Sequence, residues 1–150
     1  MTALGICLGL LTQAQVFIPT DHFTLAWTHS IEKVRWEEDY RLVGTPEALW
    51  LEATAARIKG SGAGMEPPPD ARWVNGWYTY TPAQQRVDAL RLSRSEFTQD
   101  YELCVSQTCR PMSHWVGAQP GTVVVQPCRK AGQDAPPASI TPAPAPGSSG

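Results

Sequence analysis

The 150-residue chain has few charged residues and no excess of positive charge. Only 17% of its residues are charged, and the formal net charge is -2. A protein that binds nucleic acid through the phosphate backbone needs a basic surface, and this composition does not supply one. We therefore expect no nucleic-acid partner.

Long hydrophobic runs are also missing. No apolar run approaches the roughly 18 to 20 residues that a spanning helix requires, so we expect no transmembrane segment. Residues 3–11 resemble the apolar part of a signal peptide, but no Lys or Arg precedes them and Ala14 does not lie in a small-residue cleavage site. Gly5 and Gly9 instead favour a bent first strand, followed by a second at residues 15–19.

Phosphate-binding and nucleophile motifs are absent as well. The glycines at 60, 62 and 64 could form an anion-binding nest of backbone amides. Their spacing differs from that of a P-loop or a dinucleotide fingerprint, and three prolines at 67–69 exclude a helix that could bind pyrophosphate. Ser61 lacks the flanking glycines of a nucleophile elbow. We favour a structural loop over a ligand cradle, and we expect no cofactor.

The chain does contain a segment, residues 23–42, whose alternating pattern predicts two strands joined by residues 30–33. If the strands pair antiparallel with their apolar faces matched, Phe23 lies opposite Tyr40, Leu25 opposite Glu38, and Trp27 opposite Trp36. The other face of the second strand is fully charged and suited to water; it consists of Arg35, Glu37, Asp39 and Arg41.

Glu38 is the exception on the apolar face of this hairpin. An unpaired buried carboxylate is costly, and the available partners are His29, Lys33, Arg57 and Lys59. In a structural interpretation, Glu38 lies at the sheet rim or bonds to the backbone or a tyrosine hydroxyl. In a functional one, Glu38 and His29 line a pocket that binds a ligand or moves a proton. The residues of this candidate ligand site are His29, Ser30, Glu32, Lys33, Glu38, Gly60, Ser61, Gly62 and Gly64.

Further short strands are predicted along the rest of the chain. Residues 48–58 alternate as Leu49, Leu51, Ala53 and Ala55, and we favour a strand there over a helix. Residues 73–80 form an aromatic strand that is bulged or turned at Asn75-Gly76, and residues 87–94 form a strand with Val87 out of phase. Residues 112–118 form a short helix, and residues 122–126 form a last strand. Roughly nine strands and little helix predict an all-β fold, an antiparallel β-sandwich or partly closed barrel. Residues 1–128 would be one domain, and residues 129–150 a disordered tail rich in Pro and Ala.

The four cysteines, Cys7, Cys104, Cys109 and Cys128, allow three disulfide pairings. With Ser106-Gln107 as a tight turn, Cys104 faces Cys109 directly, which would leave Cys7 for Cys128. Free thiols, or a zinc site that includes His114, are the alternatives; we commit to no metal site. Disulfides would place the protein outside the cytoplasm, whereas the lack of a recognisable signal peptide favours the cytoplasm. The localisation stays open.

Several of these segments together resemble an uncharacterised bacterial family described only as a domain of unknown function. They are residues 27–33 with a His-Ser-Ile-Glu-Lys motif, residues 36–38, the loop 60–67, Leu103-Cys104, Cys109-Arg110 and Cys128. The resemblance covers about residues 5–128. Its members are small and often encoded beside TAXI-type TRAP solute transporters. The resemblance implies a role accessory to solute uptake, and it implies no reaction and no catalytic residues.

The function that we expect is therefore that of a non-enzymatic binding or accessory domain. Its partner would be a small anionic solute or a transporter component, bound by the glycine amides of residues 60–64 together with Lys33, Lys59 or Arg57. One alternative is a hydrolase-like enzyme with Glu38 or His29 as acid or base, although Ser30 should point away from His29 and no convincing nucleophile is present. The other is a purely structural module.

Overall fold

The computed structural model describes residues 2–10, 15–28, 33–60 and 70–131, which form twelve strands and one short helix. In chain order these are β1 (Thr2–Leu10), β2 (Val16–Pro19), β3 (His22–Thr28), β4 (Arg35–Thr45), β5 (Ala48–Lys59), β6 (Arg72–Val74), β7 (Trp77–Tyr80), β8 (Arg86–Val87), β9 (Leu90–Arg94), β10 (Glu102–Val105), β11 (Thr108–Pro111), α1 (Met112–Val116) and β12 (Gly121–Ala131). The short helix and the strands at both ends of the chain were predicted.

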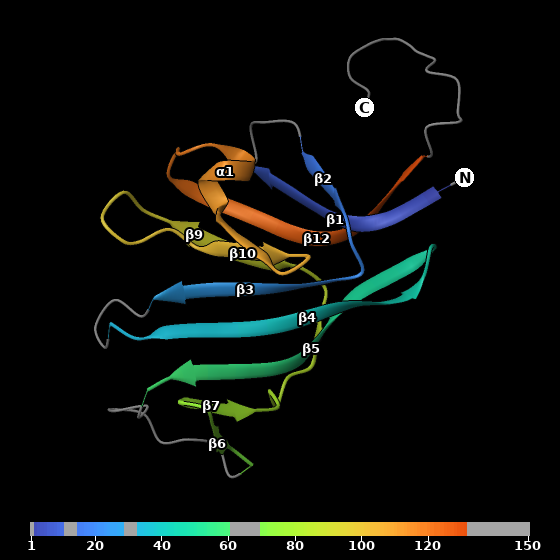
Figure 1. The fold of residues 1–150 in the computed structure, drawn as a ribbon. Helices are drawn as coiled ribbons and strands as arrows, with labels where there is room; N and C mark the ends of the chain where they lie inside the picture. Colours follow the sequence, from blue (N-terminus) through green and yellow to red (C-terminus); the bar gives the residue numbers. More distant parts are fainter. Residues whose placement is uncertain (1, 11–14, 29–32, 61–69, 132–150) are drawn as a thin grey trace.

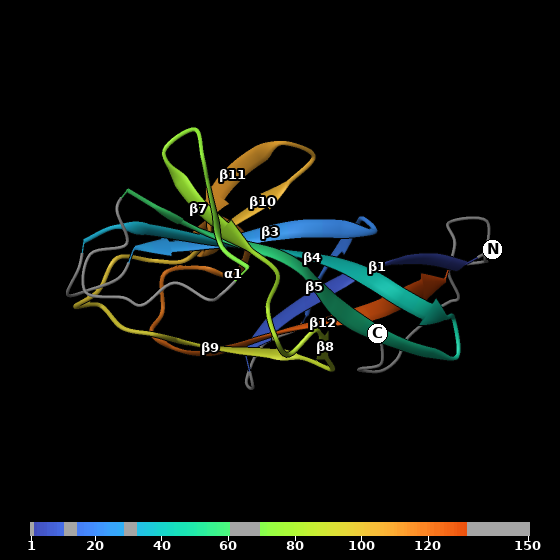
Figure 2. The same cartoon turned by 90° about the horizontal axis from the view of Figure 1, so that it is seen from below.

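The strands form two antiparallel sheets. The smaller has the order β2-β1-β12-β9, and the larger has the order β11-β10-β3-β4-β5-β7-β6 with β8 paired to β5. Figure 1 shows β1 and β12 side by side above β3, and Figure 2 shows β9 and β12 as a layer below β3 and β4. The prediction of an all-β sandwich with little helix is thus confirmed.

The core lies between the two sheets and takes side chains from both. Ile6, Leu8 and Val123 of the smaller sheet and Leu51 and Leu103 of the larger sheet are fully buried. Each such side chain contributes roughly 1.5 to 3 kcal/mol of transfer free energy. Burial of alternate residues on paired strands therefore fixes the register of both sheets.

The pairing of β3 with β4 has the register predicted from the sequence. Phe23 lies opposite Tyr40, Leu25 opposite Glu38, and Trp27 opposite Trp36. The same register would place His29 opposite Val34, and His29 lies outside the described residues.

Strand β5 confirms the strand prediction for residues 48–58 but corrects its alternation. The register of β4 with β5 shifts between Asp39 and Tyr40, where Asp39 lies opposite Ala55 and Tyr40 opposite Ala53. A β-bulge of this kind adds one residue to a strand and inverts the side-chain alternation beyond it. Ala55 consequently lies on the charged face with Asp39, whereas Ala56 and Ile58 are buried at 2% and 4% exposure.

Two of the predicted strands are each divided in two, which accounts for two of the strands beyond the predicted nine. Asn75 and Gly76 adopt φ values of 50° and 85° and form the tight turn between β6 and β7. Residues 86–94 form β8, which pairs with β5 of the larger sheet, and β9, which pairs with β12 of the smaller sheet. Val87 is out of phase with Leu92 because the chain changes sheets between them.

Both predicted disulfides are present, and they exclude the alternatives of free thiols and of a zinc site built from these cysteines. Cys7 bonds to Cys128 across a sequence separation of 121 residues, and Cys104 bonds to Cys109 across 5 residues. Loop-closure entropy assigns about 5 kcal/mol of stabilisation to the long bridge and about 2 kcal/mol to the short one.

Strand β12 continues to Ala131, past the predicted start of the tail at residue 129, and residues 132–150 lie outside the described residues.

Candidate functional site around Glu38

Glu38 lies near the middle of β4, on the side of the larger sheet that faces the core. It belongs to a row in which Leu25, Glu38, Ala56 and Tyr80 lie on four successive strands, β3, β4, β5 and β7. Leu25 and Ala56 on either side are buried, at 3% and 2% exposure, and Glu38 itself is half-buried. The row therefore places a carboxylate among apolar neighbours.

The hydroxyl of Tyr40 donates a hydrogen bond to Oε1 of Glu38. Tyr40 is 5% exposed and stacks on Phe23 with ring centroids 5.3 Å apart. Burial raises the pKa of Tyr40 far above its usual value, and the bond to Glu38 raises it further. The phenol thus remains a protonated donor, which is the partner that the structural interpretation of Glu38 expected.

Aromatic rings surround the carboxylate on this face. Trp36, two residues before Glu38, stacks with Trp27 at 6.0 Å, and Trp27 in turn contacts Tyr101 at 6.3 Å. On the other side, burial raises the pKa of Tyr80, and the negative charges of Glu38 and Asp70 raise it further. Since Tyr80 responds to the charge of Glu38, the two side chains lie within electrostatic reach of each other.

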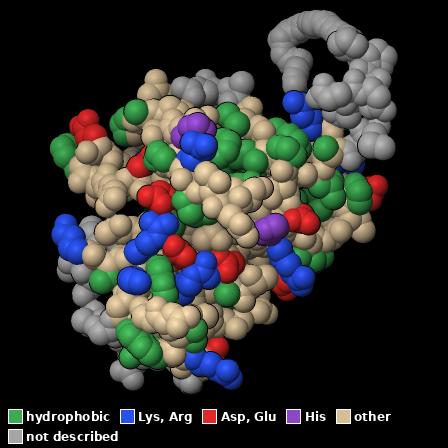
Figure 3. All heavy atoms as spheres, in the orientation of Figure 1, with side chains coloured by type: hydrophobic (Ala, Val, Ile, Leu, Met, Phe, Trp, Pro, Cys, Tyr) green, Lys and Arg blue, Asp and Glu red, His purple; other side chains and the backbone are tan. Residues whose placement is uncertain are grey.

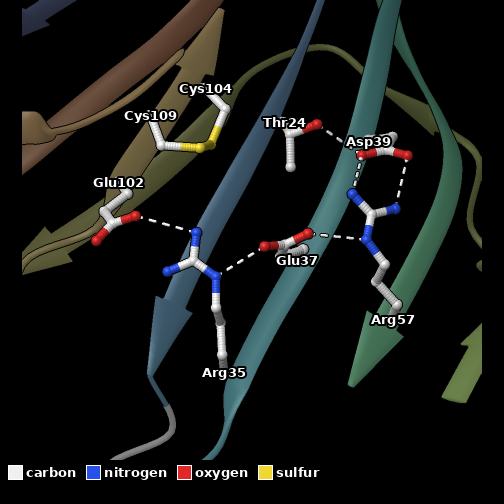
Figure 4. Close-up of a disulfide and its surroundings, with 8 residues drawn as sticks. All are labelled: Thr24, Arg35, Glu37, Asp39, Arg57, Glu102, Cys104 and Cys109. Atoms are coloured by element: carbon white, nitrogen blue, oxygen red, sulfur yellow. Dashed lines mark hydrogen bonds and ion pairs between the residues drawn. A yellow bond between two sulfur atoms is a disulfide. The ribbon is translucent and has the colours of Figure 1, made fainter. Parts of the chain in front are cut away.

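The arginine that could have paired with Glu38 lies on the opposite face of the sheet. Figure 4 shows Arg57 with Glu37 and Asp39 there. Its Nε donates to Glu37 at 2.8 Å, and its two terminal nitrogens donate to the two carboxylate oxygens of Asp39 at 2.9 and 3.0 Å. In the described part of the chain, no cation forms an ion pair with Glu38.

The ion pairs of this outer face extend across four strands, from β10 to β5. Arg35 bridges Glu37 at 2.7 Å and Glu102 at 3.0 Å, and Thr24 donates to Asp39 at 2.6 Å. We call Thr24, Arg35, Glu37, Asp39, Arg57 and Glu102 the outer network.

The outer network is more enclosed than the freely solvated face that the sequence predicted. The side chain of Glu37 is only 15% exposed and that of Arg57 25%. Burial alone would raise the pKa of Asp39, but the hydrogen bonds from Arg57 and Thr24 outweigh it and lower the pKa below its usual value. Figure 3 shows acidic and basic side chains gathered over β3 to β5. Sequence alternation located these charges, but only the β4–β5 register reveals that Arg57 joins them.

Three of the nine predicted site residues lie in the described part of the chain, namely Lys33, Glu38 and Gly60. Lys33 is exposed, with a φ of 60°. Gly60 donates its amide to the carbonyl of Gly76 at 2.9 Å, so that amide already has an acceptor. Lys59 Nζ lies 5.0 Å from the ring centre of Trp77. The remaining six, His29, Ser30, Glu32, Ser61, Gly62 and Gly64, lie outside the described residues.

A second polar feature, which the sequence did not indicate, is a surface pocket of about 220 Å³ beside Arg94 and Asp100. Arg94 is 5% exposed and bonds to both carboxylate oxygens of Asp100, at 3.0 and 3.3 Å. It also donates to the carbonyls of Gly117 and Gln119. Asp100 accepts from the amide of Ser113 at the start of α1. Because these groups already bond to one another, we assign the cluster a structural role: it connects the loops around α1 to the sandwich.

Two further site types are not found in the described part of the chain. It contains no group of three or more His, Cys, Asp and Glu side chains placed to hold a metal ion. It also contains no helix with the length and apolar character needed to cross a membrane.

The fold and the site define a small all-β sandwich domain with the carboxylate of Glu38 on its apolar inner face. The sequence pattern of the family described as "Domain of unknown function (DUF1850)" matches residues 23–112, more than half of the chain, so the chain belongs to this family. The match begins in β3, ends at the start of α1, and includes Glu38 and the outer network. No curated protein and no solved structure matches the chain significantly.

Proposed function

We propose that this domain is a non-enzymatic binding module, accessory to TRAP-type solute uptake, whose ligand or transporter partner binds at Glu38. The observation that supports a binding role is the incomplete pairing of this carboxylate. Among the described residues, its single hydrogen bond comes from a neutral phenol, and no cation there balances its charge. A half-buried charge of this kind is costly, so a ligand that completes its hydrogen bonding would stabilise the folded state.

The charge of Glu38 bears on the choice of ligand. An anionic solute would meet a negative charge at Glu38, and Arg57 is engaged by Glu37 and Asp39 on the other face. Like charges repel most strongly in partly desolvated sites. A ligand with hydroxyl or ammonium donors therefore suits Glu38 better. An anionic solute would instead require contacts from Lys33 or from residues outside the described part.

The alternative of a structural module is supported by one observation. The bond from Tyr40 already gives Glu38 a partner, and that partner is itself buried. In this alternative Glu38 contributes stability but no ligand contact.

The enzyme alternative would use Glu38 or His29 as acid or base, and its test is turnover that disappears in Glu38→Gln while the fold persists.

The experiment is a thermal-shift screen of wild type against dicarboxylates, amino acids, polyols and small ammonium salts. Each compound is also tested on Glu38→Gln and His29→Ala, with Glu47→Gln as a control because Glu47 is exposed. We expect a compound that stabilises wild type and Glu47→Gln but not Glu38→Gln. Equal responses in all proteins, together with lower stability of Glu38→Gln, would contradict binding at Glu38 and support the structural module.

A further inference from the structure

The Cys104–Cys109 bridge lies at an exposed edge of the larger sheet. β11 is an edge strand whose four residues are all exposed, including Cys109, and Cys104 is half-buried. Cys7 of the other bridge is only 8% exposed, in a strand that has β2 on one side and β12 on the other. A thiol in solution therefore reaches the short bridge more readily than the long one.

The turn beside this bridge has a backbone that its residues disfavour. Ser106 and Gln107 adopt φ values of 55° and 66°. Two-residue hairpin turns of this type normally contain Asn-Gly or Asp-Gly, because other residues rarely adopt positive φ. The cross-strand disulfide thus closes a hairpin whose turn residues do not themselves favour the hairpin conformation.

The short bridge also closes a small loop. Its cysteines are 5 residues apart, against 121 for the long bridge. Because loop-closure entropy grows with loop length, the short bridge contributes less to the stability of the fold than the long one, so the folded protein tolerates its opening better.

Buried residues on both sides of the β10–β11 hairpin anchor it to the sandwich, so an opening of the hairpin stays local. Leu103 of β10 is fully buried and lies opposite Leu25 of β3. Met112, directly after β11, is fully buried and donates its amide to the carbonyl of Tyr101 at 2.8 Å. Strand β11 can therefore detach from β10 while the sandwich remains folded.

We propose that Cys104–Cys109 is a redox-active disulfide that a dithiol reductant opens in the folded protein, while Cys7–Cys128 stays closed. A thiolate of the dithiol attacks Sγ of Cys109, the exposed residue of the pair, forming a mixed disulfide and releasing the Cys104 thiolate. The second thiol of the reductant then displaces Cys109. The reductant gives two electrons and becomes a disulfide, and the two cysteine thiolates take up the two protons that it loses.

Reduction frees the outer edge of β10, whose backbone groups are paired with β11 in the oxidised protein. The edge includes Glu102, which ends the outer network through its ion pair with Arg35 (Figure 4). The proposal is independent of any ligand at Glu38.

The test treats the folded, oxidised protein with a graded series of dithiothreitol concentrations, alkylates the free thiols, and maps them by mass spectrometry. We expect Cys104 and Cys109 to be fully alkylated at dithiothreitol concentrations that leave Cys7 and Cys128 unlabelled, because Cys109 is exposed on an edge strand and Cys7 is buried. Labelling of all four cysteines together, labelling of Cys7 and Cys128 first, or no labelling before the protein unfolds would overturn the proposal.

Hydrogen exchange of the selectively reduced protein tests the local opening. We expect faster exchange at residues 106–111 and unchanged exchange in β3 and β12; unchanged exchange everywhere would overturn the opening. The matched variant is Ser106→Asn/Gln107→Gly, which supplies a favourable turn sequence. It should keep residues 106–111 protected after reduction, and exchange as fast as in wild type would contradict the role of the turn.

Discussion

Tyr40 donates its hydroxyl hydrogen bond to Glu38, two residues earlier on the same strand and on the same face of the sheet. In a strand, residues two apart point to the same side, so the two side chains can meet without any distortion of β4. The phenol is buried and the carboxylate half-buried. This bond is therefore the internal support of the candidate site, and its removal has measurable consequences.

Replacing Tyr40 by Phe should reduce stability at neutral pH and flatten its dependence on alkaline pH. Loss of the bond should cost about 1 to 2 kcal/mol. The raised pKa of Tyr40 means that its contribution is complete below the unfolded pKa of about 10 and is lost as the pH rises beyond it. Urea unfolding from neutral to strongly alkaline pH should show wild type losing about 1.4 kcal/mol per pH unit more than Tyr40→Phe. Parallel curves would contradict this.

Replacing Asp39 by Asn should reduce stability at neutral pH and weaken its dependence on acidic pH. Because the folded pKa of Asp39 is lowered, its stabilisation is present above the unfolded pKa of about 3.9 and is lost as the pH falls through the folded pKa. The side chain is 32% exposed, so we expect only about 1 kcal/mol. Asp88→Asn is the control, since Asp88 is 81% exposed. Equal acid unfolding of both variants would refute a special role for Asp39.

The two disulfides should differ in their effect on stability. Replacing Cys7 and Cys128 by Ser should cost up to about 5 kcal/mol, and replacing Cys104 and Cys109 by Ser about 2 kcal/mol, because the first bridge closes the longer loop. Denaturant unfolding of both double variants measures the difference. A larger loss for the short bridge would show that loop entropy does not govern these bonds.

Replacing Arg94 should reduce stability more than replacing Arg91, the other arginine on β9. Replacement of Arg94 by Met removes the cation paired with Asp100 and the donor to two backbone carbonyls, and we expect a loss of about 3 kcal/mol. Arg91→Met on the same strand is the control, because Arg91 is exposed. Similar melting temperatures of the two variants would contradict a fastening role for Arg94.

The sequence predicted those parts of the fold that depend on local alternation and turn chemistry. Matching the apolar faces of residues 23–42 gave the β3–β4 register, and a tight turn at Ser106-Gln107 placed Cys104 opposite Cys109. Both predictions needed only short-range geometry. The pairing of strands distant in the sequence could not be predicted in this way. A bulge opposite Asp39 and a change of sheet after Val87 leave little trace in the local sequence pattern.

The candidate site was predicted less completely for the same reason. The position of Glu38 on an apolar face follows from period-two alternation, but the partners of Glu38 do not. Tyr40 and Arg57 were both near in the expected fold, and the inverted alternation beyond the bulge places Arg57 on the opposite face. The cluster of Arg94 and Asp100 joins loops that no periodicity relates.

The most direct test of binding at Glu38 is an NMR titration that follows the side-chain carboxyl carbon of each glutamate. The resonance of Glu38 is assigned by its absence in Glu38→Gln, and that of exposed Glu47 serves as the reference. With the compound selected by the thermal-shift screen, we expect a saturable shift of the Glu38 resonance and none of Glu47. A saturable shift confined to Glu37 and Glu102 on the outer face, with Glu38 unmoved, would contradict the proposed site.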